Sequence, residues 1–236
     1  MIQPRTFDLL ETMKWTPERG FFLLDRHLRR LARSARHFDY PCRTNDLRLA
    51  LERAVASSAI ALRVRMLLAR DGTVHVECAP VEPAPTPARL AIAQAPIDPT
   101  DVFLFHKTTN RTAYEQATRS LDGTFDDVIL WDPDGRVTES TLGNVVVEID
   151  GRKVTPPVSC GLLAGTFREQ LLEDGAIEEG PITIDQLRGA SRVWVINSVR
   201  EWWPAVLDES YRAAAMASTP TSVSTATPQT TKRSQR

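Results

Sequence analysis

The chain has 236 residues, of which 42% are hydrophobic and 25% are charged, as is usual for a soluble globular protein. Its 29 lysines and arginines nearly balance its 30 aspartates and glutamates, so the formal net charge is -1. The chain as a whole therefore offers no attractive field to nucleic acid or to an acidic membrane, and any anion site must be local.

Cysteine usage and the first residues bear on where the protein works. Cys42, Cys78 and Cys160 are widely spaced, with no CxxC motif and no Cys/His cluster at metal-ligand spacing. This pattern favours a reducing compartment and predicts no metal site. MIQPRTFDLLETMKW has no sustained apolar run, so neither a signal peptide nor a membrane span is expected. We expect a cytoplasmic protein.

Two helices are expected in the first quarter of the chain. DRHLRRLARSARHF places apolar residues at helical spacing from Asp25 to Phe38, with Asp25 as the expected N-cap and Pro41 beyond the end. A second helix is expected from Asp46 to Ser57, capped by Thr44 or Asn45. Its buried stripe should consist of Leu47, Leu51, Ala54 and Val55.

A hairpin is expected next, because the apolar period changes from helical to alternating. In LRVRMLLARDGTVHVECA, apolar side chains alternate with others on both sides of Asp71-Gly72. That dipeptide predicts a type I′ turn, which needs positive φ at both central residues. PVEPAPTPAR is rich in proline and predicts an edge or connecting segment ahead of a short strand near residues 90–93.

The second half alternates strands and helices. We expect a helix from about Thr112 to Leu121, hairpin turns at Asp134-Gly135 and Asp150-Gly151, a helix over TFREQLLED that ends before Gly175, and a strand over RVWVIN. A domain boundary is expected near residue 100, giving a small domain over 1–100 and a larger one over 101–210. Residues 211–236 are rich in Ser, Thr and Ala and are expected to be disordered.

Lys107 follows the apolar VFLF and precedes the small polar TTN. A lysine at the end of such a strand is partly desolvated, which lowers its pKa and makes it a useful nucleophile. Most lysines are solvated surface charges, so these neighbours do not decide between the two interpretations.

Other candidates are equally ambiguous alone. The arginines of DRHLRRLARSARHF favour a solvated helix side over a nucleic-acid face, although one of them can point inward to bind a small anion. GLLAGTFREQ places glycines and Thr166 before a helix, where free amides and the helix dipole bind phosphate, but it is neither a Walker loop nor GxGxxG. Glu139 could face water, and Asn197 and Ser198 could simply end a strand.

Four segments occur together in one order: HKTTNRTAYEQA, TESTLGNVVV, TPPVSCGLLAGTFR and VINSVREWWP. This series resembles the motifs of the fold-type IV pyridoxal-phosphate enzymes, which include branched-chain aminotransferases, D-amino-acid aminotransferases and aminodeoxychorismate lyases. The resemblance extends over residues 7–207. It implies a two-domain α/β fold, with a small N-terminal α/β domain, a larger β-barrel-like C-terminal domain with helices, pyridoxal 5'-phosphate between them, and a homodimer.

The resemblance also assigns roles to single residues. Lys107 is similar to the Schiff-base lysine, which also acts as a base, and Glu139 resembles the carboxylate that keeps the pyridine nitrogen protonated. Asn144 is placed beside the cofactor and Asn197 on the substrate side. A phosphate dianion needs a guanidinium and oriented donors, and the matching residues are Arg30, the amides of Thr166 and Phe167, and Ser198.

Within the family, the chain resembles the lyases. In the aminotransferases the lysine motif usually runs K-x-G-x-N-Y, and Thr112 stands here in place of that tyrosine. FDLLETMKW and GFFLLDRHLRRLARSARHFDYP resemble lyase domains fused behind para-aminobenzoate synthase component I. The implied substrate is 4-amino-4-deoxychorismate and the products are 4-aminobenzoate, for folate synthesis, and pyruvate. Arg111 and Arg200 are candidates for binding the two substrate carboxylates, and Thr109 and Thr112 for protonating the leaving pyruvate.

Two alternatives stay open: a branched-chain or D-amino-acid aminotransferase, and a non-catalytic relative that acts as partner of a synthase. The second is motivated by the polar tail and by the start of the chain, since family members usually have a further strand ahead of the segment that matches FDLLET. We therefore expect a small-domain strand to be missing or supplied by a fused aminodeoxychorismate synthase.

Overall fold

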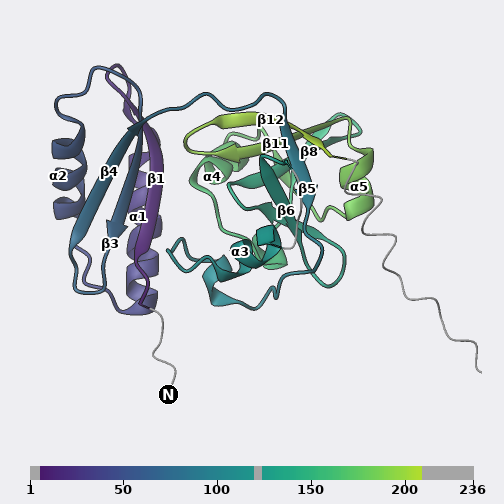
Figure 1. Cartoon of the computed structure of the whole chain (residues 1–236), viewed down its shortest axis with the longest axis horizontal. Helices are drawn as coiled ribbons and strands as arrows, with labels where there is room; N and C mark the ends of the chain where they lie inside the picture. Colours follow the sequence, from purple (N-terminus) through teal and green to yellow (C-terminus); the bar gives the residue numbers. More distant parts are fainter. Residues whose placement is uncertain (1–5, 120–123, 209–236) are drawn as a thin grey trace, which may run out of the picture.

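The structure is a computed structural model that describes residues 6–119 and 124–208. Figure 1 shows two β-sheets side by side, a small one formed early in the chain and a large one formed later. The expected disordered segment 211–236 and the expected helix end at Leu121 lie outside the described residues.

The small sheet carries two helices on one face. Its strand order is β2-β1-β3-β4, with β1 at Leu9–Thr16, β2 at Gly20–Phe21, β3 at Leu62–Leu68 and β4 at Val74–Pro80. Helices α1 (Leu24–Phe38) and α2 (Thr44–Val55) pack against the sheet through one apolar cluster. Alternation along β3 buries Val64 and Met66 in this cluster and leaves Arg63 and Arg65 on the opposite face.

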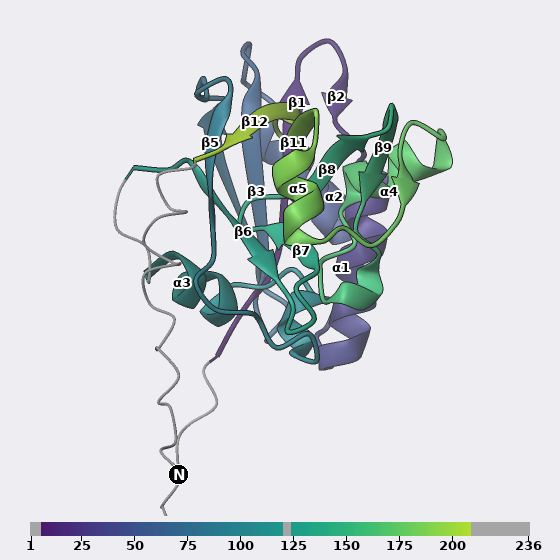
Figure 2. The same cartoon turned by 90° about the vertical axis from the view of Figure 1, so that its right-hand side faces the viewer.

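The large sheet is mixed, with strand order β10-β9-β8-β11-β12-β5-β6-β7. Its strands are β5 (Ala88–Ile92), β6 (Asp127–Trp131), β7 (Val137–Ser140), β8 (Asn144–Ile149), β9 (Arg152–Thr155), β10 (Glu178–Glu179), β11 (Arg192–Asn197) and β12 (Glu201–Leu207). Three helices accompany it, α3 (Thr112–Arg119), α4 (Thr166–Glu173) and α5 (Ile184–Gly189). Figure 2 shows α5 on the side of the large sheet that lies away from the small sheet. The α/β fold class is confirmed.

Strand β1 connects the two sheets. Leu10 N donates to Lys107 O at 2.9 Å, and Lys14 N donates to Ser198 O at 2.9 Å. Lys14 also pairs with Glu201 at 3.1 Å. Because β1 pairs with β3 through its other edge, one strand fixes the small sheet against the two segments that carry Lys107 and Ser198.

The expected hairpins are all present, but one turn type was wrong. At Asp71-Gly72 only the glycine has a positive φ, 89°, and Gly72 N donates to Ala69 O, so a type I turn followed by a left-handed glycine closes the hairpin. Asp150 and Gly151 both have positive φ, 52° and 75°, as a type I′ turn requires. Gly175 follows α4 with φ 67°, as expected.

The expected helix caps were wrong. The chain enters α1 through Leu23 in a left-handed conformation, so Asp25 lies inside the first turn, where it pairs with Arg48 at 2.7 Å. Helix α2 begins at Thr44 and is preceded by Arg43, with no side-chain cap. Ala54, expected in the buried stripe of α2, is exposed.

The segment ahead of Lys107 was also mispredicted. Val102–Leu104 is a turn of 3₁₀ helix rather than a strand, because the Asp101 side chain accepts a hydrogen bond from Phe103 N at 2.9 Å and caps it. Strand β5 pairs with β6 and β12, so the chain passes to the large sheet within residues 81–87, ahead of the boundary expected near residue 100. The division into domains stays a prediction. None of the helices in the described ranges is long and apolar enough to cross a membrane.

Candidate active site

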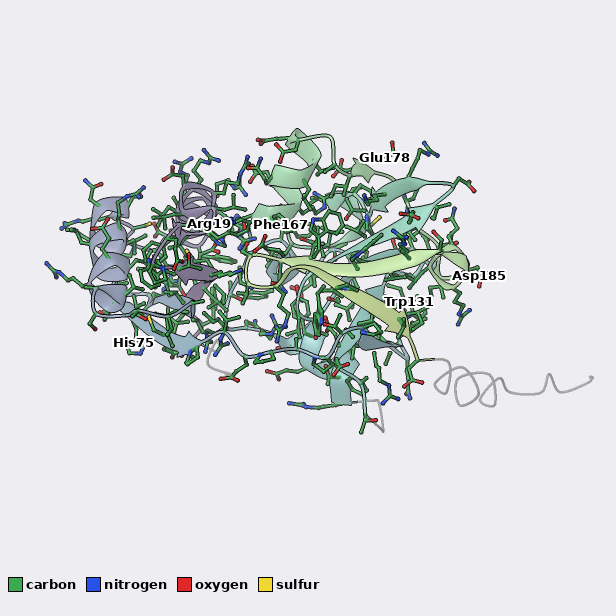
Figure 3. The ribbon with its side chains drawn as sticks, turned by 90° about the horizontal axis from the view of Figure 1, so that it is seen from above. Arg19, His75, Trp131, Phe167, Glu178 and Asp185 are labelled. Carbon is green, nitrogen blue, oxygen red and sulfur yellow. The ribbon has the colours of Figure 1, made fainter. Side chains whose placement is uncertain are left out.

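A cavity of about 320 Å³ lies between the two sheets. The small sheet and α1 contribute Leu10, Thr12, Arg30, Arg63 and Arg65 to its wall. The remaining wall comes from the segment around Lys107, from β7 and the turn after it, from the start of α4, and from the turn between β11 and β12. Figure 3 shows Phe167, in the first turn of α4, on the side of the large sheet that faces the small one.

Lys107 lies in the wall of this cavity and is fixed through its backbone. Its carbonyl accepts from Leu10 N, and the next residue, Thr108, bridges to Leu9. Burial lowers the pKa of Lys107 to about 8, with the Arg30 guanidinium acting in the same direction, while Glu11 oppositely favours the charged form. About a tenth of this amine is therefore neutral and nucleophilic at pH 7, and about half at pH 8.

Glu139, on β7, faces Lys107 from the large sheet and is 3% exposed. It accepts a hydrogen bond from the Tyr114 hydroxyl at 2.7 Å and one from Leu163 N at 3.3 Å. Burial raises the pKa of Glu139 to about 7, although these hydrogen bonds and the charge of Lys107 favour the carboxylate. A cationic nitrogen placed beside Glu139 would restore it to the charged form.

Close backbone approach defines the wall beside Glu139. Asn144 donates from Nδ2 to Leu163 O at 2.9 Å and reaches Glu139 at 3.4 Å. A Cβ on Gly165 would lie 2.0 Å from Asn144 Oδ1, and one on Gly143 would lie 2.5 Å from Ile196 O. Gly143 therefore packs against the backbone of β11 with no space for a side chain, and Gly165 packs against the side-chain amide of Asn144, which would have to move to admit one.

The start of α4 provides a set of anion donors. The first amides of a helix have no intrahelical acceptor, so those of Thr166 and Phe167 are available to a ligand. The Thr166 hydroxyl lies 2.6 Å from the Ser198 hydroxyl, and Arg30 approaches from α1 to donate to Ala164 O at 3.0 Å. These four residues line one end of the cavity.

A buried ionic cluster stands behind this end. Glu11 accepts from Arg30 Nε at 2.9 Å and from Arg30 Nη2 at 2.6 Å, and lies 2.6 Å from His27 Nδ1. Burial by itself would raise the pKa of Glu11, but Arg30 and His27 hold that pKa at about 2. Burial lowers the pKa of His27. The carboxylate of Glu11 thus fixes the guanidinium of Arg30.

Further arginines line the same cavity. Arg111 donates to Thr141 O at 2.5 Å and stacks over the Tyr114 ring at 4.3 Å. Arg200 stacks over the Trp203 ring at 4.7 Å, and its Nε is buried without a hydrogen-bond partner among the described residues. Arg63 and Arg65 enter from β3, and Arg65 lies 3.3 Å from Glu77. The wall of the cavity therefore carries several positive charges besides Arg30 and Lys107.

The structure brings most of the sequence-predicted residues into one cavity. Its wall includes Lys107, Arg30, Glu139, Asn144, Thr166, Phe167, Ser198, Arg111, Asn197 and Arg200. Asn197 accepts from Val199 N and Arg200 N, both at 2.9 Å, and so shapes the turn after β11.

Thr109 and Thr112 are not part of the wall. Thr109 Oγ1 accepts from Asp8 N at 2.9 Å, and the Thr112 hydroxyl donates to Asn110 Oδ1 at 2.8 Å. Both side chains therefore support the backbone around Lys107, and the geometry gives no support to their role as proton donors.

Sequence reasoning missed Glu11, His27, Tyr114, Arg63 and Arg65. The alternation of LRVRMLL was a usable signal, because it places both arginines on the face opposite the apolar residues. Glu11 and His27 gave no such signal, since their burial depends on the contact between β1 and α1.

The chain belongs to the class IV aminotransferase family, whose description, amino-transferase class IV, matches residues 8–207. Its fold is that of the fold-type IV pyridoxal-phosphate enzymes, and enzymes of this family depend on pyridoxal phosphate.

Two relatives are named after a lyase. A putative aminodeoxychorismate lyase of Schizosaccharomyces pombe is 33% identical over 209 residues, which is 85% of this chain and 89% of the relative. The 4-amino-4-deoxychorismate lyase of Pseudomonas aeruginosa has a solved structure that superposes with a TM-score of 0.71 at 21% identity, over 85% of this chain and 82% of that one, which is a likeness of fold.

A third similar protein has another name. The structure of a putative amino-acid aminotransferase from Mesorhizobium loti superposes with a TM-score of 0.81 at 35% identity, over 86% of this chain and all of that one.

Proposed function

We propose that this protein is a lyase that uses pyridoxal 5'-phosphate to convert 4-amino-4-deoxychorismate into 4-aminobenzoate and pyruvate. By resemblance, we also propose that it acts as a cytoplasmic homodimer in folate biosynthesis and takes its substrate from an aminodeoxychorismate synthase. The names of the S. pombe relative and of the P. aeruginosa structure support the reaction.

The donor set of the cavity fits the cofactor. A buried amine with a lowered pKa stands at its centre, at Lys107. Glu139 offers a carboxylate for a ring nitrogen, and the α4 amides, Ser198 and Arg30 offer hydrogen bonds for a phosphate group. Because Gly165 has no side chain, the start of α4 lies close to Asn144, and the α4 amides lie beside the cavity. When bound, pyridoxal phosphate supplies a ring that accepts electrons from a neighbouring carbon.

Residues of the chain supply the rest of the chemistry. Lys107 Nζ is neutral in part near pH 8, so it can take a proton from the carbon that bears the substrate amine. Glu139, with a pKa of about 7, is partly protonated near neutral pH, and it becomes fully ionised when a cationic ring nitrogen lies beside it. Glu11 already orients the guanidinium of Arg30, so Arg30 loses little conformational freedom when it binds the phosphate group.

The further arginines of the cavity wall bear on the choice of substrate. Aminodeoxychorismate has two carboxylates, and Arg63, Arg65 and Arg200 provide cations for them within one cavity. A branched-chain amino acid needs an apolar wall for its side chain and a cation for one carboxylate only. The arginine-rich wall is therefore the observation that most favours a substrate with two carboxylates, such as aminodeoxychorismate, over a branched-chain amino acid.

An amino-acid aminotransferase is the second candidate, because the similar M. loti structure carries that description. To decide, the purified protein is given aminodeoxychorismate in one reaction and an amino acid with 2-oxoglutarate in another. We expect pyruvate and 4-aminobenzoate from the first and little glutamate from the second. Glutamate formation without pyruvate release would overturn the lyase.

The position of the cofactor is tested by borohydride reduction of the protein loaded with pyridoxal phosphate, followed by peptide mass analysis. We expect the adduct on the peptide that contains Lys107, with yield rising as pH approaches about 8, because only the neutral amine reacts. The Lys107→Ala variant should show no adduct and lose activity by at least about 10²-fold. Failure of the wild-type protein to bind the cofactor would favour a non-catalytic relative.

A further inference from the structure

The anion end of the cavity is backed by a continuous chain of hydrogen bonds. Glu11 Oε2 lies 2.6 Å from His27 Nδ1, and His27 Nε2 lies 3.2 Å from Thr166 Oγ1. Thr166 Oγ1 in turn lies 2.6 Å from Ser198 Oγ. Glu11 and His27 have no exposed surface, whereas Thr166 and Ser198 line the cavity. The chain thus runs from a buried carboxylate to hydroxyls that a ligand can reach.

The protonation state of His27 sets the direction of this chain. The carboxylate of Glu11 is an acceptor, so Nδ1 carries a proton and donates to it. When His27 is neutral, Nε2 accepts from the Thr166 hydroxyl, and Thr166 Oγ1 then accepts from the Ser198 hydroxyl. Both hydroxyl groups then donate to protein acceptors, and neither has a proton available to a ligand in the cavity.

A second proton on His27, at Nε2, reverses the donor–acceptor direction of these hydrogen bonds. Nε2 then donates to Thr166 Oγ1, so the Thr166 hydroxyl no longer has to donate to the ring. Thr166 can donate to Ser198, and the Ser198 hydroxyl is released toward the cavity. One added proton therefore converts the hydroxyl pair into a donor for an anion.

We propose that His27 is a positioning residue of this site, which takes up one proton from solvent when a phosphate group binds and thereby turns a Thr166 or Ser198 proton toward it. The proposal rests on the proposed function only in that pyridoxal phosphate supplies the phosphate group. Glu11 has two tasks in this arrangement, since it orients Arg30 and fixes the proton on His27 Nδ1.

The charges around His27 give the sign of the effect. Glu11 faces it from β1, Arg30 from the same helix and Lys107 from the segment before α3, while α4 and the turn after β11 present hydroxyls. Without a ligand, burial lowers the pKa of His27, with Arg30 and Lys107 acting in the same direction and Glu11 opposing them. A phosphate dianion nearby raises that pKa. Affinity gained from the proton is present at lower pH and lost as pH rises through the raised pKa.

The test measures proton uptake by calorimetry. Pyridoxal phosphate is titrated into the wild-type protein and into His27→Gln, in two buffers that differ in ionisation heat. We expect the wild type to take up more protons than the variant, by up to about one per site, and its affinity to fall more steeply with pH, by up to about tenfold per pH unit. Ionisation of Lys107 and of the phosphate itself contributes to both proteins and cancels in the comparison.

Pyridoxal, which lacks the phosphate group, is the matched control ligand, and it should give the same proton uptake in both proteins. Equal uptake of protons with pyridoxal phosphate in wild type and variant would overturn the role of His27 and leave the cofactor site standing. No binding of pyridoxal phosphate to the wild type would overturn both.

A second measurement needs no change at the site. The imidazole ¹⁵N resonances of the four histidines are followed in the wild-type protein, and assigned through His37→Gln, His75→Gln and His106→Gln. On addition of pyridoxal phosphate we expect the His27 signals to titrate at higher pH. If they do not move, the proposal is wrong even if His27→Gln fails to fold.

Discussion

Two buried carboxylates in this protein differ in pKa because they have different partners. Glu11 is paired with Arg30 and His27, and its pKa lies at about 2. Glu139 is bonded to a neutral hydroxyl and an amide, and burial raises its pKa to about 7. Glu11 is thus already paired in the free protein and has a supporting role, while Glu139 forms no ion pair among the described residues and can accept a cation from a ligand.

Two arginines of the cavity wall can be tested with single neutral substitutions. Arg63→Gln and Arg65→Gln should each raise KM for aminodeoxychorismate about tenfold, a loss of about 1.4 kcal/mol in binding, with a smaller change in kcat. Each removes a charge from the cavity wall but leaves the cofactor donors intact.

Arg48→Gln is the matched control, since Arg48 pairs with Asp25 on the exposed surface and should leave KM unchanged. An unchanged KM in both Arg63→Gln and Arg65→Gln would show that these side chains do not contact the substrate.

At the scale of elements, the sequence predicted those whose pattern is local. The β3–β4 hairpin and α1 have clear alternation or helical spacing, and both are present. Strands β1 and β12 were not predicted, since LLETMKWT contains a charged residue on each face, Glu11 toward α1 and Lys14 toward the large sheet, and EWWPAVL contains a proline. Helix α5 has six residues, and its signal was the Thr183–Gln186 capping box rather than an apolar period.

The same distinction between local patterns and long-range contacts applies to the candidate site. The residues of the four motifs could be placed together because the resemblance supplied their order, and the structure puts most of them in one cavity. Contacts between distant elements, such as those of Glu11 with His27 and of Tyr114 with Glu139, could not be predicted from spacing. Packing of β1 against α1 and of α3 against the large sheet determines them.

The close approach of Gly165 to Asn144 at the start of α4 can be tested with an alanine substitution, which adds one carbon atom. In Gly165→Ala the new Cβ would lie 2.0 Å from Asn144 Oδ1, so either the Asn144 side chain, which donates to Leu163 O and Glu139, or the start of α4 must move. We expect a loss of about 1–3 kcal/mol in the free energy of unfolding and a clear fall in affinity for pyridoxal phosphate. Urea denaturation and an absorbance titration measure the two effects.

Gly189→Ala, at the end of α5, is the control, because its Cβ would meet nothing within 4 Å. Its stability should be unchanged or slightly higher. If Gly165→Ala behaves like this control in both assays, α4 does not approach Asn144 as closely as the structure indicates.

At the scale of the whole molecule, β1 makes the two sheets one unit. Leu10 and Lys14 donate across to the segments of Lys107 and Ser198, while Thr12, between them, lines the cavity and its amide has no acceptor among the described residues. Separation of the sheets would therefore expose the amides of Leu10 and Lys14 together.

Hydrogen exchange resolved to single amides tests this arrangement. We expect the amides of Leu10 and Lys14 to share one protection factor and the amide of Thr12 to exchange faster in the absence of cofactor. Protection of Leu10 and Lys14 should rise together on addition of pyridoxal phosphate, since a ligand between the sheets opposes their separation. Independent rates for the two amides would show that the sheets do not move as units.

The wall of the cavity has a consequence for synthesis of the protein on the ribosome. The donors proposed for the phosphate group come from Arg30, from the start of α4 and from Ser198, so they span most of the described chain. A nascent chain that has emerged only as far as α4 has Lys107 and Glu139 but lacks the strands β11 and β12 that bring Ser198 to Thr166. If the cofactor binds as proposed, its site is complete only when translation of the large sheet is nearly finished.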